Sequence, residues 1–286
     1  MCLPLLSVHA GCLLALATGT SATALAVCAG FLWLRAFGLT AGYHRYFAHR
    51  SYRTSRAFQF ALAWLGASAA QLGPLWWAAH HRLHHRHSDT ALDVHSPHAR
   101  SLWWAHLGWL VCRRHSATRF DAITDFARHP ELRFLDRWHA LAPLSLVALL
   151  FLAGEALRAY APGLATSGAQ LVAWGFFVGT TVLYHVTFAV NSLGHAVGSR
   201  RFATRDRSRN SALLALVTLG DGWHNNHHAH PLLARHGLRW WELDATYLGL
   251  RGLAALGVVW DLRLPSATPA ATAVAHARAK RSPTRA

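Results

Sequence analysis

The sequence is short of charged residues. Asp, Glu, Lys and Arg make up only 14% of its 286 residues, against about 25% in a typical soluble domain. Hydrophobic residues make up 53%. So few charges argue against a soluble globular domain, and we expect a bilayer to replace water around much of the surface.

Acidic residues are the scarcest charged group. The sequence has 12 Asp and Glu against 28 Lys and Arg, which gives a formal charge of +16. Lys280 is the only lysine. A basic surface of this kind favours an anionic membrane leaflet, acidic electron-carrier proteins or phosphate-bearing ligands. Long apolar runs argue against nucleic acid as the partner.

Cysteine is also rare and is not arranged in pairs. The four cysteines form no C-x-x-C motif; they are Cys2, Cys12, Cys28 and Cys112. The sequence therefore predicts neither a disulfide framework nor a ferredoxin-type iron–sulfur cluster.

Four apolar runs predict four membrane-spanning helices, since a span needs about 20 mostly apolar residues. We expect them to pair as two hairpins in an all-α integral membrane protein. The spans are residues 3–18, 21–40, 140–157 and 169–190. The first hairpin turns at a Gly-Thr-Ser break at residues 19–21, and the second at a polar turn near residues 158–167.

The remaining segments predict a helical cap and a tail. Residues 41–137 and 191–265 form the cap, and the basic tail 266–286, rich in Ala, Pro and Thr, is expected to be disordered. Residues 41–137 carry thirteen arginines, whereas the hairpin turns carry almost none. The positive-inside rule then makes the cap and both termini cytoplasmic.

Tryptophan is abundant, with 13 residues. Several of them suit an aromatic belt at headgroup depth. These are Trp76, Trp77, Trp103, Trp104, Trp109, Trp240 and Trp241.

Nine of the 22 histidines fall into four short clusters. The clusters are His44 with His49; His81, His84 and His85; His195 with Asn191; and His224, His227 and His228. Neutral imidazole binds iron, copper, zinc or nickel. The i, i+3, i+4 spacing of the second and fourth clusters puts three rings on one face of a helix. Nine imidazoles are too many for one tetrahedral zinc, so the sequence predicts a dinuclear metal site.

The other thirteen histidines are interpreted differently. Some are expected to be surface or satisfied buried residues, among them His9, His106, His129, His139 and His276. Others lie beside the clusters and are either partners of the ligands or surface residues. These are His80, His87, His95, His98 and His230.

The clusters carry a specific resemblance. The chain resembles the membrane-bound fatty-acyl desaturases, especially the stearoyl-CoA (Δ9) type and its bacterial relatives, from about Phe31 to Asp261. The matching strings are Thr40-Ala-Gly-Tyr-His44-Arg-Tyr-Phe-Ala-His49, His81-Arg-Leu-His84-His85, Asn191-Ser-Leu-Gly-His195 and Gly220-Asp-Gly-Trp-His224-Asn-Asn-His227-His228. One departure is Asp221, which stands where the family usually has glutamate.

The resemblance implies a site and a tunnel. The nine histidines would hold two ferrous ions, with Asn191 contacting one of them through water. Gln71, Trp77 and Thr187 would line the bend of a substrate tunnel.

The resemblance also implies an O₂-dependent reaction in a bacterial inner membrane. It introduces a cis double bond, expected at Δ9, into a saturated long-chain acyl group, which is expected on CoA; acyl carrier protein and phospholipid stay open as the carrier. Abstracting hydrogen from an unactivated methylene needs a metal–oxygen oxidant. Because the chain carries no cytochrome b5 domain, flavin motif or ferredoxin cysteine set, two electrons must come from a separate donor of the ferredoxin, rubredoxin or cytochrome b5 type.

Two alternatives stay open at this point. A histidine-rich di-iron hydroxylase or ketolase would share the clusters but insert oxygen. A transition-metal transporter would place its ligands at mid-membrane depth, whereas these clusters are predicted at one cytoplasmic edge.

Overall fold

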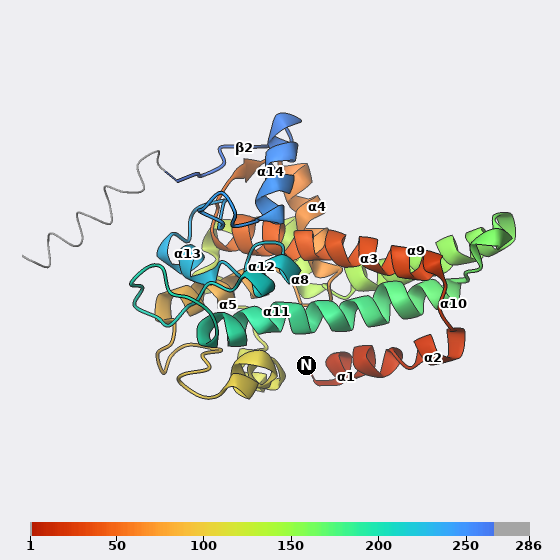
Figure 1. Cartoon of the computed structure of the whole chain (residues 1–286), viewed down its shortest axis with the longest axis horizontal. Coiled ribbons are helices and arrows are strands. Elements are labelled where there is room, and N and C mark those ends of the chain that lie inside the picture. Colours follow the sequence, from red (N-terminus) through yellow and green to blue (C-terminus); the bar gives the residue numbers. More distant parts are fainter. Residues whose placement is uncertain (1, 266–286) are drawn as a thin grey trace, which may run out of the picture.

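The fold of this chain, described by a computed structural model over residues 2–265, is almost entirely helical (Figure 1). The strands described there are β1 (Arg53–Thr54) and β2 (Val259–Trp260), which pair antiparallel. Figure 1 shows long helices running side by side, with shorter segments gathered at one of their ends. The predicted tail 266–286 lies outside the described residues.

Three helical stretches are long and apolar enough to cross a membrane. They are Ala22–Ala48, Leu141–Tyr160 and Gly168–Ala196. The first consists of α3 (Ala22–Phe37) and η1 (Gly38–Ala48), and the second is α9 (Leu141–Tyr160). The third consists of α10 (Gly168–Leu171), η6 (Val172–Val178) and α11 (Gly179–Ala196).

The predicted first span forms a shorter apolar helical stretch, Leu3–Thr18, made of α1 (Cys2–Gly11) and α2 (Leu14–Thr18). Figure 1 shows it running beside the long helices. The predicted break at residues 19–21 is confirmed, because Gly19 has a φ of 68° and the Ser21 hydroxyl caps α3 by accepting from the Ala24 N–H. The Ser21 hydroxyl also donates to Gln170 on α10. The first turn is thereby tied to the second hairpin.

Two helices continue past the predicted span ends. The helices expected to stop at residues 40 and 190 continue to Ala48 and Ala196. Every residue of η1 is buried, so its polar side chains face protein rather than lipid, and the fall in hydropathy does not end the helix. Segments with π-helical hydrogen bonding, such as η1, often occur at functional sites. Because the two helices continue to Ala48 and Ala196, His44 and His195 lie on extensions of long helices rather than in a separate cap.

The short helices pack at the ends of the long ones. Those on the side of the histidines are α4 (Arg56–Ala67), α5 (Pro74–His87), η2 (Trp104–Gly108), α6 (Trp109–Val111), η3 (Arg113–His115), η4 (Phe120–Ala122), α7 (Thr124–Ala127), α8 (Pro130–Arg137), α12 (Ala212–Val217), α13 (His224–Ala229) and α14 (Ala245–Ala255). At the other end, η5 (Pro162–Leu164) joins α9 to α10. The largest buried apolar cluster draws on η1, α4, α5 and α8.

The aromatic belt was predicted too broadly. Trp103, Trp240 and Trp241 are exposed, as a belt requires. Trp76 and Trp109 are instead buried, with 3% and 5% of their surface exposed. Their rings stack on each other from two different helices, α5 and α6. A contact between helices cannot be predicted from the spacing of residues within one segment.

The positive-inside prediction is open to a direct test. Tags at either terminus and within residues 100–130 should be protected in sealed vesicles that keep the cytoplasmic face inside, and a tag near Gly163 should be accessible. Protease protection or impermeant labelling measures both. Access to residues 100–130 from outside would contradict a cytoplasmic position of the histidines.

Candidate metal centre

Helices carry almost all of the predicted ligands. η1 holds His44 and ends just before His49, and α11 holds Asn191 and His195. The two triplets lie on α5 and α13, as their spacing predicted. The four clusters are therefore presented by four elements that are far apart in sequence.

The structure brings the nine histidines together as two adjacent groups. In each group the ligand nitrogens lie within 4.8 Å of one another. The five-histidine group consists of His44, His49, His81, His85 and His227, and the four-histidine group of His84, His195, His224 and His228. The rings of His85 and His228, one from each group, stack with centroids 4.3 Å apart.

Each triplet is divided between the groups. His81 and His85, four residues apart on α5, share the five-histidine group, whereas His84 belongs to the other. On α13 the outer two histidines, His224 and His228, belong to the four-histidine group, and His227 between them belongs to the five-histidine group. Neighbouring residues on a helix point about 100° apart, so consecutive histidines reach different groups. We expected the three rings of each triplet to lie on one face of the helix, but the structure directs them to two groups.

The spacing of the ring nitrogens fits metal coordination. In the five-histidine group, Nε2 atoms lie 3.0 Å apart for His44 and His227 and 2.9 Å apart for His49 and His81. Two nitrogens bound to one ion at about 2.1 Å lie about 3.0–3.4 Å apart. The spacing of these rings is therefore compatible with a shared metal ion.

Carboxylates orient four of the rings. In each case the ring Nδ1 lies within hydrogen-bond distance of the acid and leaves Nε2 for a metal, a common arrangement around bound ions. The pairs are His44 with Asp221 at 2.8 Å, His84 with Asp93 at 2.9 Å, His195 with Asp89 at 2.9 Å and His228 with Asp206 at 2.6 Å. The substituted acid of the fourth string, Asp221, thus serves a ligand directly.

Two ring nitrogens are left without a hydrogen-bond partner at the centre of the four-histidine group. They are Nε2 of His84 and Nε2 of His228, and both are buried. A buried polar atom without a partner costs free energy unless something such as an ion satisfies it. Because the Nδ1 of each ring faces a carboxylate, these nitrogens fit a metal ion.

Electrostatics keeps most of the rings neutral. Burial, followed by the neighbouring histidines, holds the pKa of His49, His81 and His85 well below the ordinary value. The same causes lower the pKa of the α13 histidines. Neutral imidazole is the form that binds metal. His84 differs: its burial lowers the pKa, but Asp93, together with Asp89 and Asp206, outweighs that effect, so the pKa of His84 is raised.

Several residues of the site were missed by sequence reasoning. His236 is buried, and its Nδ1 lies 3.2 Å from the Asp221 carboxylate. His95, which the sequence left as either a partner of the ligands or a surface residue, is buried against the ring of His84. The acids Asp89, Asp93 and Asp206 were also missed, although a signal existed: in a chain with twelve acidic residues, two of them follow the second histidine cluster within eight positions.

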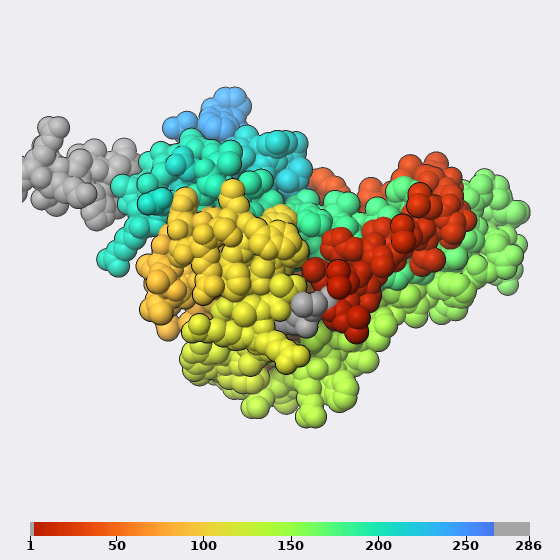
Figure 2. Space-filling view, turned by 90° about the horizontal axis from the view of Figure 1, so that it is seen from below, coloured from red at the N-terminus to blue at the C-terminus, as the bar shows by residue number. Residues whose placement is uncertain are grey.

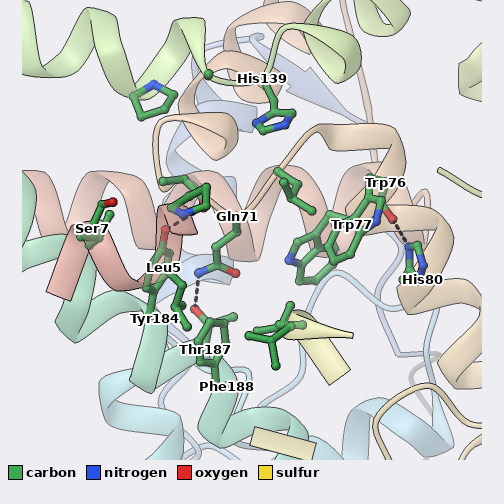
Figure 3. A pocket seen from close by; sticks show the side chains of 18 of the residues that line it. Leu5, Ser7, Gln71, Trp76, Trp77, His80, His139, Tyr184, Thr187 and Phe188 are labelled. Carbon is green, nitrogen blue, oxygen red and sulfur yellow. Dashed lines mark hydrogen bonds between the residues drawn. The ribbon is translucent and has the colours of Figure 1, made fainter. Parts of the chain in front are cut away.

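An apolar cavity of about 480 Å³ reaches the ligands (Figure 3). Its lining includes His81 of the five-histidine group and Asn191, together with Leu5 on α1 and Leu144 on α9. The proposed tunnel residues also line it; they are Gln71, Trp77 and Thr187. The Trp77 ring stacks on His81 with centroids 5.1 Å apart.

Gln71 is held in the cavity wall by its neighbours. Its side-chain amide donates to the Thr187 hydroxyl at 3.1 Å, a contact drawn in Figure 3. Ala70 and Leu72 on either side have positive φ values of 56° and 67°. Such backbone strain is found mainly where the surroundings enforce it, often at functional sites. Here the hydroxyl of Tyr184 donates to the carbonyl of Ala70, and that of Tyr43 to the carbonyl of Leu72.

The fold and the site together define a helical protein that has three helices long and apolar enough to cross a membrane and two adjacent histidine groups beside an apolar cavity. Residues 20–261 match the fatty acid desaturase family. The chain is 36% identical over 262 residues to the sn-1 stearoyl-lipid 9-desaturase of Anabaena variabilis, covering 91% of each chain. It is 35% identical over 233 residues to the acyl-CoA C20 Delta5-desaturase of Anemone leveillei, covering 80% of this chain and 70% of that one. It is 36% identical over 232 residues to the sn-2 palmitoyl-lipid 9-desaturase of Nostoc sp. (strain 36), covering 79% and 76%.

The chain therefore belongs to the fatty acid desaturase family. It is a fatty-acyl desaturase, an oxidoreductase of lipid metabolism, and the resemblance noted in the sequence is confirmed. Its histidine groups are compatible with the metal site that this activity needs.

The carboxylate contact of His44 generates a prediction. Asp221→Asn removes the negative charge that orients this ring, so metal affinity should fall roughly 10–100-fold, as it does when other such partners are lost. Asp261→Asn is the control, because Asp261 is exposed and its one ion pair within residues 2–265 is with Arg53. Elemental analysis of purified protein across a chelator series measures the affinity. An Asp221→Asn protein that retains metal like the parent would show that this carboxylate does not support the ligand.

Proposed function

We propose that the protein is an O₂-dependent, di-iron acyl desaturase that introduces a cis double bond at Δ9 of a saturated long-chain acyl group. The cavity supports this proposal most directly. It is apolar along the long helices and meets a metal ligand, His81, together with Asn191. A chain of methylene groups lying in it would pass beside the histidine groups.

The residues for the two ions follow from the two groups. One iron would be held by His44, His49, His81, His85 and His227, and the other by His84, His195, His224 and His228, with Asn191 contacting one of them through water. Bound iron supplies the activation of O₂ that hydrogen abstraction from a methylene requires. The desaturation also needs two electrons, which we propose come from a separate carrier protein.

The chain's own residues position the substrate. Trp77 covers one side of His81, so a hydrocarbon beside this ring contacts an aromatic face and water is kept out. Gln71 and Thr187 form a polar cross-link in an otherwise apolar wall. We propose that this cross-link marks the bend at which the acyl chain turns past the metal site, so that the two hydrogens leave from one side and the product is cis.

The membrane arrangement completes the proposal. Residues 3–18 would pair with Ala22–Ala48, and Leu141–Tyr160 with Gly168–Ala196, as two hairpins in a bacterial inner membrane. The acyl carrier is CoA or a glycerolipid, because relatives named for each carrier are similar to this chain. In both cases the saturated hydrocarbon is the part that enters the cavity.

Expression in a host that lacks its own desaturases tests the proposal. The parent should form cis-Δ9 monoenes and retain two irons per chain, and His85→Ala should abolish the product and lower the iron content because a coordination position opens. His129→Ala is the control, since His129 is outside both groups and lies near Glu131. Gas chromatography and mass spectrometry locate the double bond, and membrane assays with stearoyl-CoA or stearoyl-glycerolipid distinguish the carriers. A hydroxylated product, or full activity in His85→Ala, contradicts the proposal.

The tunnel residues generate a further prediction. Thr187→Leu removes the partner of Gln71, and Trp77→Ala opens the wall beside His81. Both variants should change the rate, the chain-length preference or the double-bond position while the iron content stays at the parent value. Val182→Leu, on the exposed side of α11, should change none of them. If Thr187→Leu and Trp77→Ala give the parent's products at the parent's rate, these residues do not shape the tunnel.

A further inference from the structure

A row of aromatic rings leads away from the four-histidine group. The ring of His84 stacks on that of His95 with centroids 4.2 Å apart, and His95 contacts Trp109 at 5.0 Å. Trp109 also stacks nearly parallel on Trp76 at 5.6 Å. Apart from His84, none of these residues belongs to either histidine group. Buried rings therefore continue outward from a proposed metal ligand.

The row reaches the surface through two further rings. Trp109 contacts His115 at 6.3 Å, and His115 contacts Trp104 at 6.2 Å. The guanidinium of Arg100 lies over Trp104, 4.3 Å from the ring centroid. Trp104 and His115 are both partly exposed. The yellow segment around residue 100 forms part of the molecular surface beside the N-terminal helices in Figure 2.

Hydrogen bonds hold the row in place. The indole N–H of Trp76 donates to the His115 carbonyl at 2.8 Å, and that of Trp104 donates to the Val94 carbonyl at 3.0 Å. Trp76, Trp109 and Val94 form an apolar cluster of their own. The rings are thus fixed relative to one another and to α5, which carries His84.

The outer end of the row is positively charged. Arg100, Arg113 and Arg114 are exposed, and within residues 2–265 none of them forms an ion pair. Burial, followed by Arg114 and Arg100, lowers the pKa of His115. The positive charge at this end therefore comes from the arginines that surround a neutral ring.

The proposed reaction needs such an entry point. One saturated acyl chain, O₂, two electrons and two protons give one monoene and two waters, so two electrons must enter a buried site from outside. Electron tunnelling weakens steeply with distance, and a carrier must dock near a continuous path of packed groups. We propose that Arg100, Arg113 and Arg114, around Trp104, form the docking surface of an acidic one-electron carrier protein, and that His115, Trp109 and His95 couple it to His84. This inference rests on the proposed di-iron function.

An anionic membrane surface is the other occupant to consider. Leu102 and Trp103 beside Arg100 are exposed by 50% and 65%, and Trp and Arg are common at headgroup depth. Lipid binding, however, needs no buried rings between the surface and a metal ligand. The row through Trp109 and His95 favours the carrier, and complementary charge would speed its association.

The docking surface is tested by anaerobic reduction of the iron-loaded protein without substrate. Reduced ferredoxin, rubredoxin and the soluble domain of cytochrome b5, each chosen in an acidic form, are mixed with it in a stopped-flow instrument. Arg113→Glu combined with Arg114→Glu should lower the second-order rate constant about tenfold or more at low salt and weaken its dependence on ionic strength. Carrier affinity for the metal-free protein should fall in parallel.

A matched pair controls for net charge. Arg53→Glu with Arg251→Glu makes the same change of charge on β1 and α14, which lie at the opposite edge of the short-helix end in Figure 1. This variant should be reduced and should bind the carrier like the parent.

The row is tested separately from docking. Trp109→Leu should lower the limiting first-order rate several-fold while carrier affinity stays unchanged, and Trp109→Phe, which keeps a ring, should recover much of the loss. Trp104→Leu should also be slower, whereas Trp103→Leu, the exposed neighbour, should match the parent. Because Trp109 also lines the cavity, omitting substrate separates electron entry from substrate binding.

Three results overturn the inference. One is reduction of the Arg113→Glu, Arg114→Glu protein at the parent's rate. If this protein also fails to bind phosphatidylglycerol vesicles, the arginines bind lipid rather than a carrier. Another is a limiting first-order rate of reduction in Trp109→Leu that equals the rate of the parent protein. The third is a parent that none of the three carriers reduces although dithionite supports desaturation, which leaves the proposed function standing. No desaturation even with dithionite would instead contradict the proposed function.

Discussion

The structure depends on gathering nine imidazoles into two adjacent groups that are largely shielded from water. Burial disfavours the protonated ring, and carboxylates orient four of the nine at 2.6–2.9 Å. The chain has only twelve acidic residues, so a third of them serve this purpose. The few acidic residues of this sequence are therefore concentrated where they orient histidine rings. A lipid-facing surface leaves little use for carboxylates elsewhere.

The same interactions join distant parts of the chain. Arg45 on η1 is fully buried and contacts Asp221 at 3.1 Å and Asp244 at 3.0 Å. It also donates to the carbonyl of Ala234 at 2.7 Å. Removing one partner of such a buried network is costly, because the other charge is left unpaired. The extension of the first long helix is thus locked to the segments around α13 and α14, and the site and the fold stabilise each other.

The cavity shows how position on one helix links substrate to metal. α5 carries Trp77 one turn before His81, so one face of the helix presents the cavity wall and a proposed ligand together. The placement of Gln71 had no such local basis. It depends on two hydroxyls, from Tyr43 and Tyr184, that hold a strained loop from other helices.

The sequence by itself determined the histidine clusters, the helices that carry two of them, the break at Gly19 and three long apolar helices. These are properties of short segments, where spacing and hydropathy act locally. Tertiary structure alone decided which histidines share a group, why the long helices continue to Ala48 and Ala196, and why Trp76 and Trp109 are buried. His44 and Asp221 lie 177 positions apart and touch at 2.8 Å. Contacts of that kind depend on how distant helices pack, and no local pattern encodes them.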